Sequence, residues 1–80
     1  MYFTYILQSL KSGGYYIGYS GNILERLSAH NRGSTRSTKA GRPWKLVYAV
    51  EFTSKEEAMK REKLIKSYKG GDAFKNLIAN

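Results

Sequence analysis

The stretch Gly13–His30, GGYYIGYSGNILERLSAH, decides the fold of this chain. It opens with two glycines, and glycine can adopt the positive φ angles that a hairpin turn needs. The tyrosine-rich segment that follows is typical of a β-strand. Ser20 or Asn22 can then cap a helix. We therefore expect a turn, a strand and a helix in close succession, with their side chains gathered at one corner.

The predicted corner carries chemically active side chains. One face of its helix presents Ile23, Leu27 and His30, at positions i, i+4 and i+7, and Arg26 lies four residues before His30. The strand adds tyrosines, and Gly18, having no side chain, leaves room for a ligand or another backbone. Tyrosine, arginine and histidine at one corner of a basic chain predict a site that handles phosphate.

Working outward, the remaining segments complete a small fold of the α/β (α+β) class. The order β-β-α-β-α-α predicts a single domain over residues 1–80, with a three-stranded sheet and helices packed on it. The first two strands form an antiparallel hairpin. The third strand is apolar at nearly every position, so we expect it at the centre of the sheet. The predicted strands are Tyr2–Leu7, Tyr15–Tyr19 and Trp44–Phe52, the helices Ile23–His30, Lys55–Tyr68 and Ala73–Ile78, and the surface loop Arg32–Arg42.

Composition narrows the class of protein. The chain has 80 residues, of which 41% are hydrophobic and 14% aromatic, so it is not disordered by composition. It has no cysteine, which excludes disulfides and thiolate metal sites and fits a reducing cytoplasm. The N-terminal segment resembles a strand and not a signal peptide, and no apolar run is long enough to span a bilayer. We expect a cytoplasmic protein without a membrane partner.

The net charge of the chain predicts a polyanionic binding partner. Fourteen Lys and Arg residues against six Asp and Glu residues give a formal net charge of +8. Nucleic acid is the first expected partner and an anionic membrane surface the second, while solubility alone is the plain alternative. The predicted basic loop is expected to contact a nucleic-acid backbone without reading its sequence. Its cationic residues are Arg32, Arg36, Lys39 and Arg42.

The second long helix contains an unexpected carboxylate. Ala58, Glu62 and Ile65 fall on one stripe at i, i+4 and i+7, so an acid occupies a position where the pattern favours an apolar residue. Burying an acid is costly unless it is paired or binds a metal. Glu62 is therefore either a metal ligand or a salt-bridged residue at the edge of the stripe.

These residues together closely resemble the GIY-YIG nuclease domain, and the resemblance covers the whole chain. It is strongest to the short stand-alone bacterial proteins of that superfamily, whose domain also occurs in the nucleotide-excision-repair nuclease subunit UvrC. The first motif departs from the family pattern, because Phe3-Thr4-Tyr5 keeps only its tyrosine. The matching positions are Tyr5, Tyr16-Ile17-Gly18, Asn22, Arg26, His30 and Glu62, with Asn76 as the candidate for a later family asparagine.

The resemblance implies a metal-dependent endonuclease that hydrolyses DNA phosphodiester bonds, structure-directed or non-specific, in DNA repair or recombination. Glu62 would hold Mg²⁺ or Mn²⁺, and Arg26 would bind the scissile phosphate. Tyr16 would act as the general base or position the water. His30 would take the proton from Tyr16 or bond to the phosphate, and Tyr5 would orient the water or the substrate.

Other readings stay open at this stage. The tyrosines could be half-buried strand residues, and His30 could be a residue favoured at a helix C-terminus. The whole domain could be an inactive or partner-dependent nucleic-acid-binding module, or an adaptor that binds an acidic protein. A protein partner or a homodimer would be consistent with so small a domain.

Overall fold

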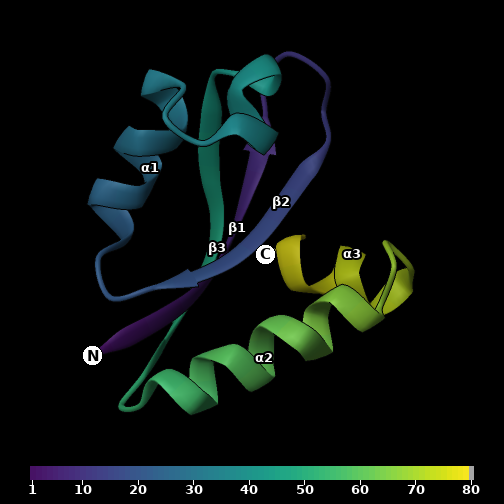
Figure 1. Ribbon diagram of the computed structural model, residues 1–80. Coiled ribbons are helices and arrows are strands. Elements are labelled where there is room, and N and C mark those ends of the chain that lie inside the picture. Colours follow the sequence, from purple (N-terminus) through teal and green to yellow (C-terminus); the bar gives the residue numbers. More distant parts are fainter. Residues whose placement is uncertain (80) are drawn as a thin grey trace.

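The computed structural model describes residues 1–79 and has the predicted α+β architecture (Figure 1). Three strands form one sheet, and helices pack on it. Within residues 1–79, no helix is long and apolar enough to cross a membrane. The elements in chain order are β1 (Tyr2–Ser9), β2 (Tyr15–Ser20), α1 (Ile23–Arg32), the 3₁₀ helix η1 (Arg36–Gly41), β3 (Trp44–Phe52), α2 (Lys55–Ser67) and α3 (Asp72–Ile78).

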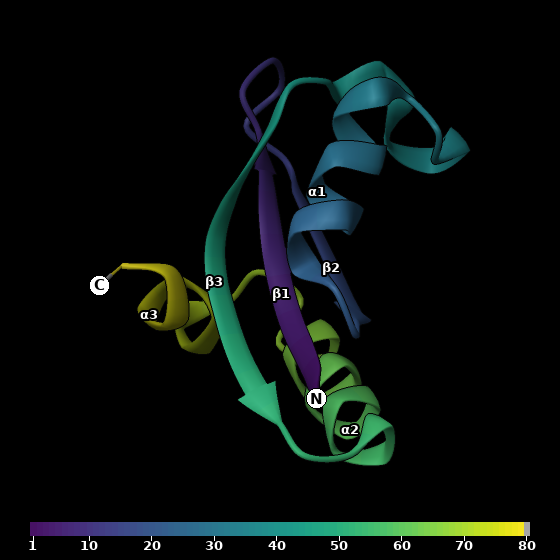
Figure 2. The same cartoon turned by 90° about the vertical axis from the view of Figure 1, so that its left-hand side faces the viewer.

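The sheet has the order β2-β1-β3, and both pairs are antiparallel. Figure 2 shows β1 between its two neighbours. The prediction of a central third strand is therefore wrong, because β1 occupies the centre and β3 an edge. The buried run Thr4–Leu7 belongs to β1. In β3, by contrast, Leu46 is 38% exposed, so its apolar composition does not reflect coverage on both faces.

Alternate residues of β1 serve opposite faces of the sheet. Ile6 packs with Ile65 of α2 and Phe74 of α3 in the hydrophobic core. Next to it, the Thr4 hydroxyl donates to the carbonyl oxygen of Ala58 at 2.8 Å and ties β1 to α2. Tyr5 points the other way, toward α1. In Figure 1 the strands lie between α1 and α3, and α2 runs beneath them.

Side-chain caps fix where two helices begin. The Asn22 side chain accepts from the backbone N–H of Glu25 at 3.0 Å, so Asn22 and not Ser20 caps α1. The Ser54 hydroxyl accepts from the backbone N–H of Glu57 at 3.2 Å at the start of α2. These bonds satisfy amide groups that have no partner inside the helix.

The segment Arg32–Arg42 differs from the loop that its composition predicts. Arg32 ends α1, and Arg36–Gly41 forms η1. Contacts from β3, which follows this helix, and from β1, which is distant in sequence, hold it in place. The Trp44 indole N–H donates to the Thr38 carbonyl at 2.8 Å, and the Ser9 hydroxyl donates to the Gly41 carbonyl at 2.6 Å. Tertiary contacts order a segment that lacks apolar periodicity.

Candidate active site

Tyr5 is the buried centre of the site. It lies on β1, is 1% exposed, and pairs in register with Gly18 of β2. A Cβ atom at Gly18 would sit 2.8 Å from the Tyr5 hydroxyl oxygen and 3.1 Å from Cε1 of Tyr16. The glycine is therefore required by close approach, as predicted, but the group that approaches is the phenol of Tyr5 and not a ligand or a backbone.

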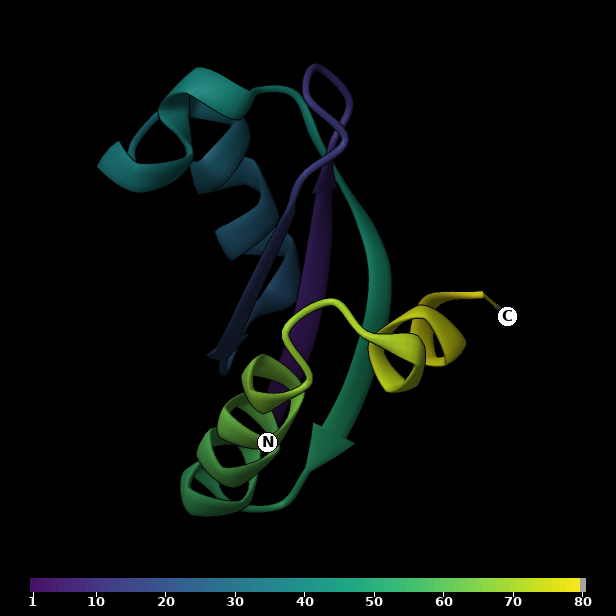
Figure 3. The same cartoon turned by 90° about the vertical axis from the view of Figure 1, so that its right-hand side faces the viewer.

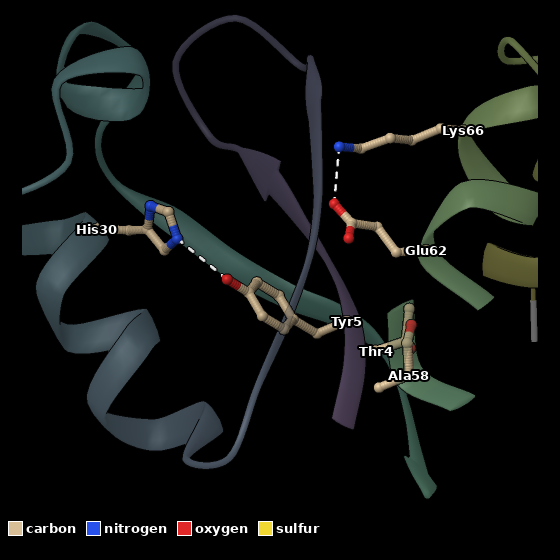
Figure 4. Close-up of polar contacts among 6 residues, drawn as sticks. All are labelled: Thr4, Tyr5, His30, Ala58, Glu62 and Lys66. Carbon is tan, nitrogen blue, oxygen red and sulfur yellow. Dashed lines mark hydrogen bonds and ion pairs between the residues drawn. The ribbon is translucent and has the colours of Figure 1, made fainter. Parts of the chain in front are cut away.

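His30 is fully buried on α1 and uses both ring nitrogens, and Figure 4 shows the contact of one of them with Tyr5. Its Nε2 lies 3.4 Å from the Tyr5 hydroxyl, and its Nδ1 lies 2.7 Å from Oγ1 of Thr38. With no exposed surface and no spare nitrogen, His30 does not reach a phosphate in this arrangement. The phenol that bonds to His30 is that of Tyr5.

Tyr16 lies beside this pair on the same face of the sheet. It pairs with Leu7 across β1 and β2, two positions from the Tyr5–Gly18 pair. Its ring centroid is 4.7 Å from that of His30 and 6.4 Å from that of Tyr5. Tyr16 is half-buried, so it offers the site a phenol closer to solvent than that of Tyr5.

Arg26 supplies the positive charge of the cluster. Hydrogen bonding with Tyr5, followed by Coulomb attraction to Tyr5 and Tyr16, raises the pKa of Arg26 above its usual value. Burial raises the pKa of Tyr5, although Arg26 acts to lower it. Burial and the nearby Arg26 charge lower the pKa of His30 below 6.5. The imidazole is therefore neutral at pH 7 and able to accept a proton.

Glu62 approaches from the other side of the hairpin. Its side chain is 16% exposed and forms an ion pair with Lys66, with Oε2 and Nζ 2.7 Å apart. Figure 4 shows both side chains extending from α2 toward β2. The negative charge of Glu62 contributes to the raised pKa of Tyr5, so the carboxylate lies within electrostatic reach of the cluster. Within residues 1–79, no group of three His, Cys, Asp or Glu side chains could hold a metal.

The five predicted residues thus divide into two groups. Tyr5, Tyr16, Arg26 and His30 form one contiguous cluster between β1, β2 and α1, whereas Glu62 is linked to it through charge alone. Sequence reasoning missed two partners. Lys66 lies four residues after Glu62 on a helix, a spacing visible in the sequence. Thr38 lies in a polar segment and gave no signal.

The four cationic residues predicted to contact nucleic acid differ in their side-chain hydrogen bonds. Arg42 donates through Nε to the Lys39 carbonyl at 2.9 Å and through Nη1 to the Arg32 carbonyl at 3.2 Å. Arg32 donates to the Ser28 hydroxyl at 3.0 Å. Arg42 therefore holds the turn between α1 and β3, whereas the Arg32 side chain bonds within α1. No side-chain hydrogen bond engages Arg36 within residues 1–79.

An open hollow of about 700 Å³ lies at this end of the molecule. Figure 3 shows η1 and the hairpin tip at one end of the sheet and α2 at the other. The hollow adds Lys11, from the hairpin turn, to the predicted cations. The chain segment 26–50 contains six Lys and Arg residues and no acid. The cationic residues that line the hollow are Lys11, Arg36, Lys39 and Arg42.

The fold and this cluster define a class of catalytic domain. The model of the GIY-YIG catalytic domain family matches residues 1–73. The chain belongs to the GIY-YIG family, and membership indicates nuclease chemistry acting on nucleic acid.

Similar proteins carry the name UPF0213. A UPF0213 protein of Streptococcus pneumoniae is 46% identical over 68 residues, which are 84% of this chain and 68% of that protein. The UPF0213 protein SH2523 of Staphylococcus haemolyticus is 41% identical over 68 residues, 84% of this chain and 82% of the relative. The solution NMR structure of the UPF0213 protein BH0048 from Bacillus halodurans is 32% identical, with 95% of this chain and 94% of that chain covered and a TM-score of 0.48.

Proposed function

We propose that this chain is a divalent-metal-dependent endonuclease that hydrolyses DNA phosphodiester bonds. The observation that carries the proposal is the contact of a neutral, buried His30 with the Tyr5 phenol beside the Arg26 guanidinium. A proton acceptor, a phenol and a fixed positive charge are what water activation next to a phosphate requires.

Arg26 binds the scissile phosphate in this proposal. Its guanidinium keeps its charge at any working pH and offers paired donors that match two phosphate oxygens. Tyr16, which is half-buried, contacts the attacking water as general base or positioning group. Tyr5, which is buried, passes a proton toward His30 and keeps the phenols and the guanidinium in register.

Glu62 is the candidate ligand for Mg²⁺ or Mn²⁺. A lone carboxylate fits a hard cation that keeps most of its waters and takes its remaining ligands from substrate phosphate. Such a cation lowers the pKa of a bound water and neutralises charge that develops on the phosphate. In the structure the Glu62 carboxylate is paired with Lys66, so a divalent ion would compete with the ammonium group for it. Both the metal-ligand and the salt-bridge reading of Glu62 therefore stay compatible with its geometry.

The basic hollow would bind the nucleic-acid backbone away from the cut. Lys11 comes from the hairpin tip, whereas Arg36 and Lys39 lie in η1 and Arg42 follows it, so a phosphate in the hollow would contact two segments distant in sequence. Backbone contacts of this kind give salt-sensitive binding with little sequence specificity. The wider parts of the proposal are a cytoplasmic role in DNA repair or recombination, structure-directed or non-specific cutting, and action with a protein partner or as a homodimer.

A nicking assay on supercoiled plasmid with Mg²⁺ or Mn²⁺ tests the proposal. We expect Glu62→Gln to lose nicking by at least about 100-fold while DNA affinity stays within about twofold. Exposed Glu56, in the first turn of the same helix, provides the matched control Glu56→Gln, which should nick normally. Nicking by Glu62→Gln at the rate of the unmodified protein would contradict the role of this carboxylate.

A second candidate is a nucleic-acid-binding module without turnover. The observation that favours it is the Glu62–Lys66 ion pair, which neutralises the Glu62 carboxylate. This module would bind DNA with the salt dependence expected of the basic hollow but would not cut it with Mg²⁺ or Mn²⁺. The binding and nicking assays, run on the same preparation, separate the two candidates.

A further inference from the structure

Thr38 is a buried side chain that the proposed chemistry does not yet use. It lies in η1, is 2% exposed, and its hydroxyl oxygen is 2.7 Å from Nδ1 of His30. The same hydroxyl is positioned to donate to the Thr35 carbonyl at 3.3 Å. A threonine hydroxyl has one proton, so if it donates to Thr35 it must accept from His30.

The contact at Nε2 of His30 also indicates that the imidazole proton is on Nδ1. The Tyr5 hydroxyl is buried, and Nε2 of His30, at 3.4 Å, is its hydrogen-bond partner within residues 1–79. Arg26, which lies against Tyr5, has donors only and cannot take the phenol proton. If Nε2 carried the imidazole proton, the Tyr5 proton would be left without an acceptor in a buried site, which is costly.

We propose that Thr38 is a positioning residue that holds His30 in the Nδ1–H tautomer, so that the Nε2 lone pair faces the Tyr5 hydroxyl. Every donor then has an acceptor: Tyr5 O–H to Nε2, Nδ1–H to Thr38, and the Thr38 O–H to Thr35. The role in catalysis rests on the proposed nuclease function, whereas the tautomer rests on the hydrogen bonds alone.

The assignment gives the proton a defined route. In the step concerned, the Tyr5 O–H bond breaks, an Nε2–H bond forms, and the Tyr5 phenolate recovers a proton that Tyr16 removes from the attacking water. His30 then carries a positive charge, which Thr38 stabilises by accepting from Nδ1–H. Thr38 also lies between Arg36 and Lys39 in η1, and both of these residues line the hollow. A nucleic-acid backbone bound in the hollow would therefore stabilise the helix that positions the imidazole.

Nitrogen-15 NMR of the full chain tests the tautomer directly. The chain has a single histidine, so the two ring-nitrogen resonances need no assignment among residues. We expect, at pH 7.5, a protonated Nδ1 and an unprotonated Nε2. A protonated Nε2 in the unmodified protein overturns the proposal, and this measurement does not depend on any variant or on activity.

Two variants of Thr38 test its part. Thr38→Ser keeps the hydroxyl, so it should keep the Nδ1–H tautomer and nick plasmid within about threefold of the unmodified rate. Thr38→Val keeps the shape but removes the acceptor. We expect it to shift the proton toward Nε2 and to lower kcat about 10- to 100-fold, with KM changed little. An unchanged tautomer in a folded Thr38→Val protein overturns the positioning role.

The two proposals fail in different ways. If the unmodified protein shows Nδ1–H but cuts no DNA, the positioning of His30 by Thr38 stands and the nuclease function is wrong. If the protein cuts DNA with Nε2 protonated, the nuclease function stands and the positioning role is wrong.

Discussion

The Tyr5 hydroxyl lies 3.4 Å from Nε2 of His30, although 25 residues separate the two in the chain. One comes from the central strand and the other from the helix that covers one face of the sheet. The contact puts a neutral imidazole behind a phenol, with a guanidinium alongside. The predictions for Tyr5, Gly18 and His30 depend on this contact.

Removing the Tyr5 hydroxyl should abolish activity without unfolding the protein. Tyr5→Phe keeps the buried ring and loses the bond to His30, so we expect plasmid nicking to fall at least about 100-fold. Urea denaturation should show a loss of about 1 kcal/mol in the free energy of unfolding. Tyr15→Phe is the matched control, since Tyr15 lies on the same hairpin and is 43% exposed; equal losses in both variants would argue against a special role for Tyr5.

Gly18→Ala should disturb both phenols at once. The added methyl group would sit 2.8 Å from the Tyr5 oxygen and 3.1 Å from the Tyr16 ring, inside contact distance. We expect a destabilisation of about 1–3 kcal/mol, measured by urea denaturation, together with loss of nicking. Gly21→Ala is the control, because its nearest contact is at 3.7 Å. If the Gly18→Ala protein is as stable and as active as the Gly21→Ala protein, the Tyr5 and Tyr16 rings move aside at little cost and the close approach does not require glycine.

Lys66→Gln should strengthen metal binding at Glu62. The ammonium group competes with a divalent ion for the carboxylate, and this pair is partly exposed, with Lys66 56% exposed. We therefore expect Mn²⁺ affinity, measured by water-proton relaxation, to rise only about two- to fivefold. Lys63→Gln removes an exposed charge from the same helix without touching Glu62 and should have a smaller effect. Weaker Mn²⁺ binding in Lys66→Gln would contradict competition between the two cations.

Acidification below pH 6.5 should destabilise the protein through His30. Burial and Arg26 hold the folded-state pKa of His30 below the ordinary value of 6.5. As pH falls below 6.5, the histidine of the unfolded chain binds a proton while that of the folded chain stays neutral. The free energy of unfolding is therefore highest above this pH and decreases below it. Urea denaturation between pH 7.5 and about 5.5, above the range where most carboxylates titrate, measures the slope. Because the chain has one histidine, His30→Gln should flatten the slope; a slope that persists would assign it to another group.

The basic hollow should set the salt dependence of DNA binding. Each of Lys11→Gln, Arg36→Gln and Lys39→Gln should weaken binding and reduce the slope of log K against log salt by about 1. Fluorescence anisotropy with a labelled duplex over a salt series measures both quantities. Lys75→Gln, on α3 away from the hollow, should leave the slope unchanged. If Lys75→Gln weakens binding as much as the three variants in the hollow, DNA affinity depends on the net charge of the protein and not on this surface.

Local signals in the sequence predicted most of the elements. Together with the family resemblance, they also identified the four clustered side chains Tyr5, Tyr16, Arg26 and His30. The Asn22 cap, the positive φ of Gly13 in the hairpin turn and the helical spacing of Arg26 and His30 each act over a few residues. Such short-range chemistry is visible without knowing the fold. Glu62 also stood out, because a carboxylate interrupted an apolar stripe.

Other features follow only from long-range packing. The prediction failed for β3, since an apolar strand can lie at the centre or at an edge, and the decision depends on which strand pairs with both others. It also failed for η1, which is held by Ser9 of the distant strand β1 as well as by Trp44 of the strand that follows it. Thr38 gave no signal for the same reason, since its partner His30 is brought to it by the turn after α1.

The sequence by itself determined the element order, the basic character and the residue types available for phosphate chemistry, because these depend on composition and on contacts a few residues apart. Only the tertiary structure decided that His30 faces Tyr5, that Thr38 sits behind the imidazole, and that Glu62 is paired with Lys66. Hydrogen bonds and ion pairs act over about 3 Å. Which atoms come within that distance is settled when the sheet and helices pack.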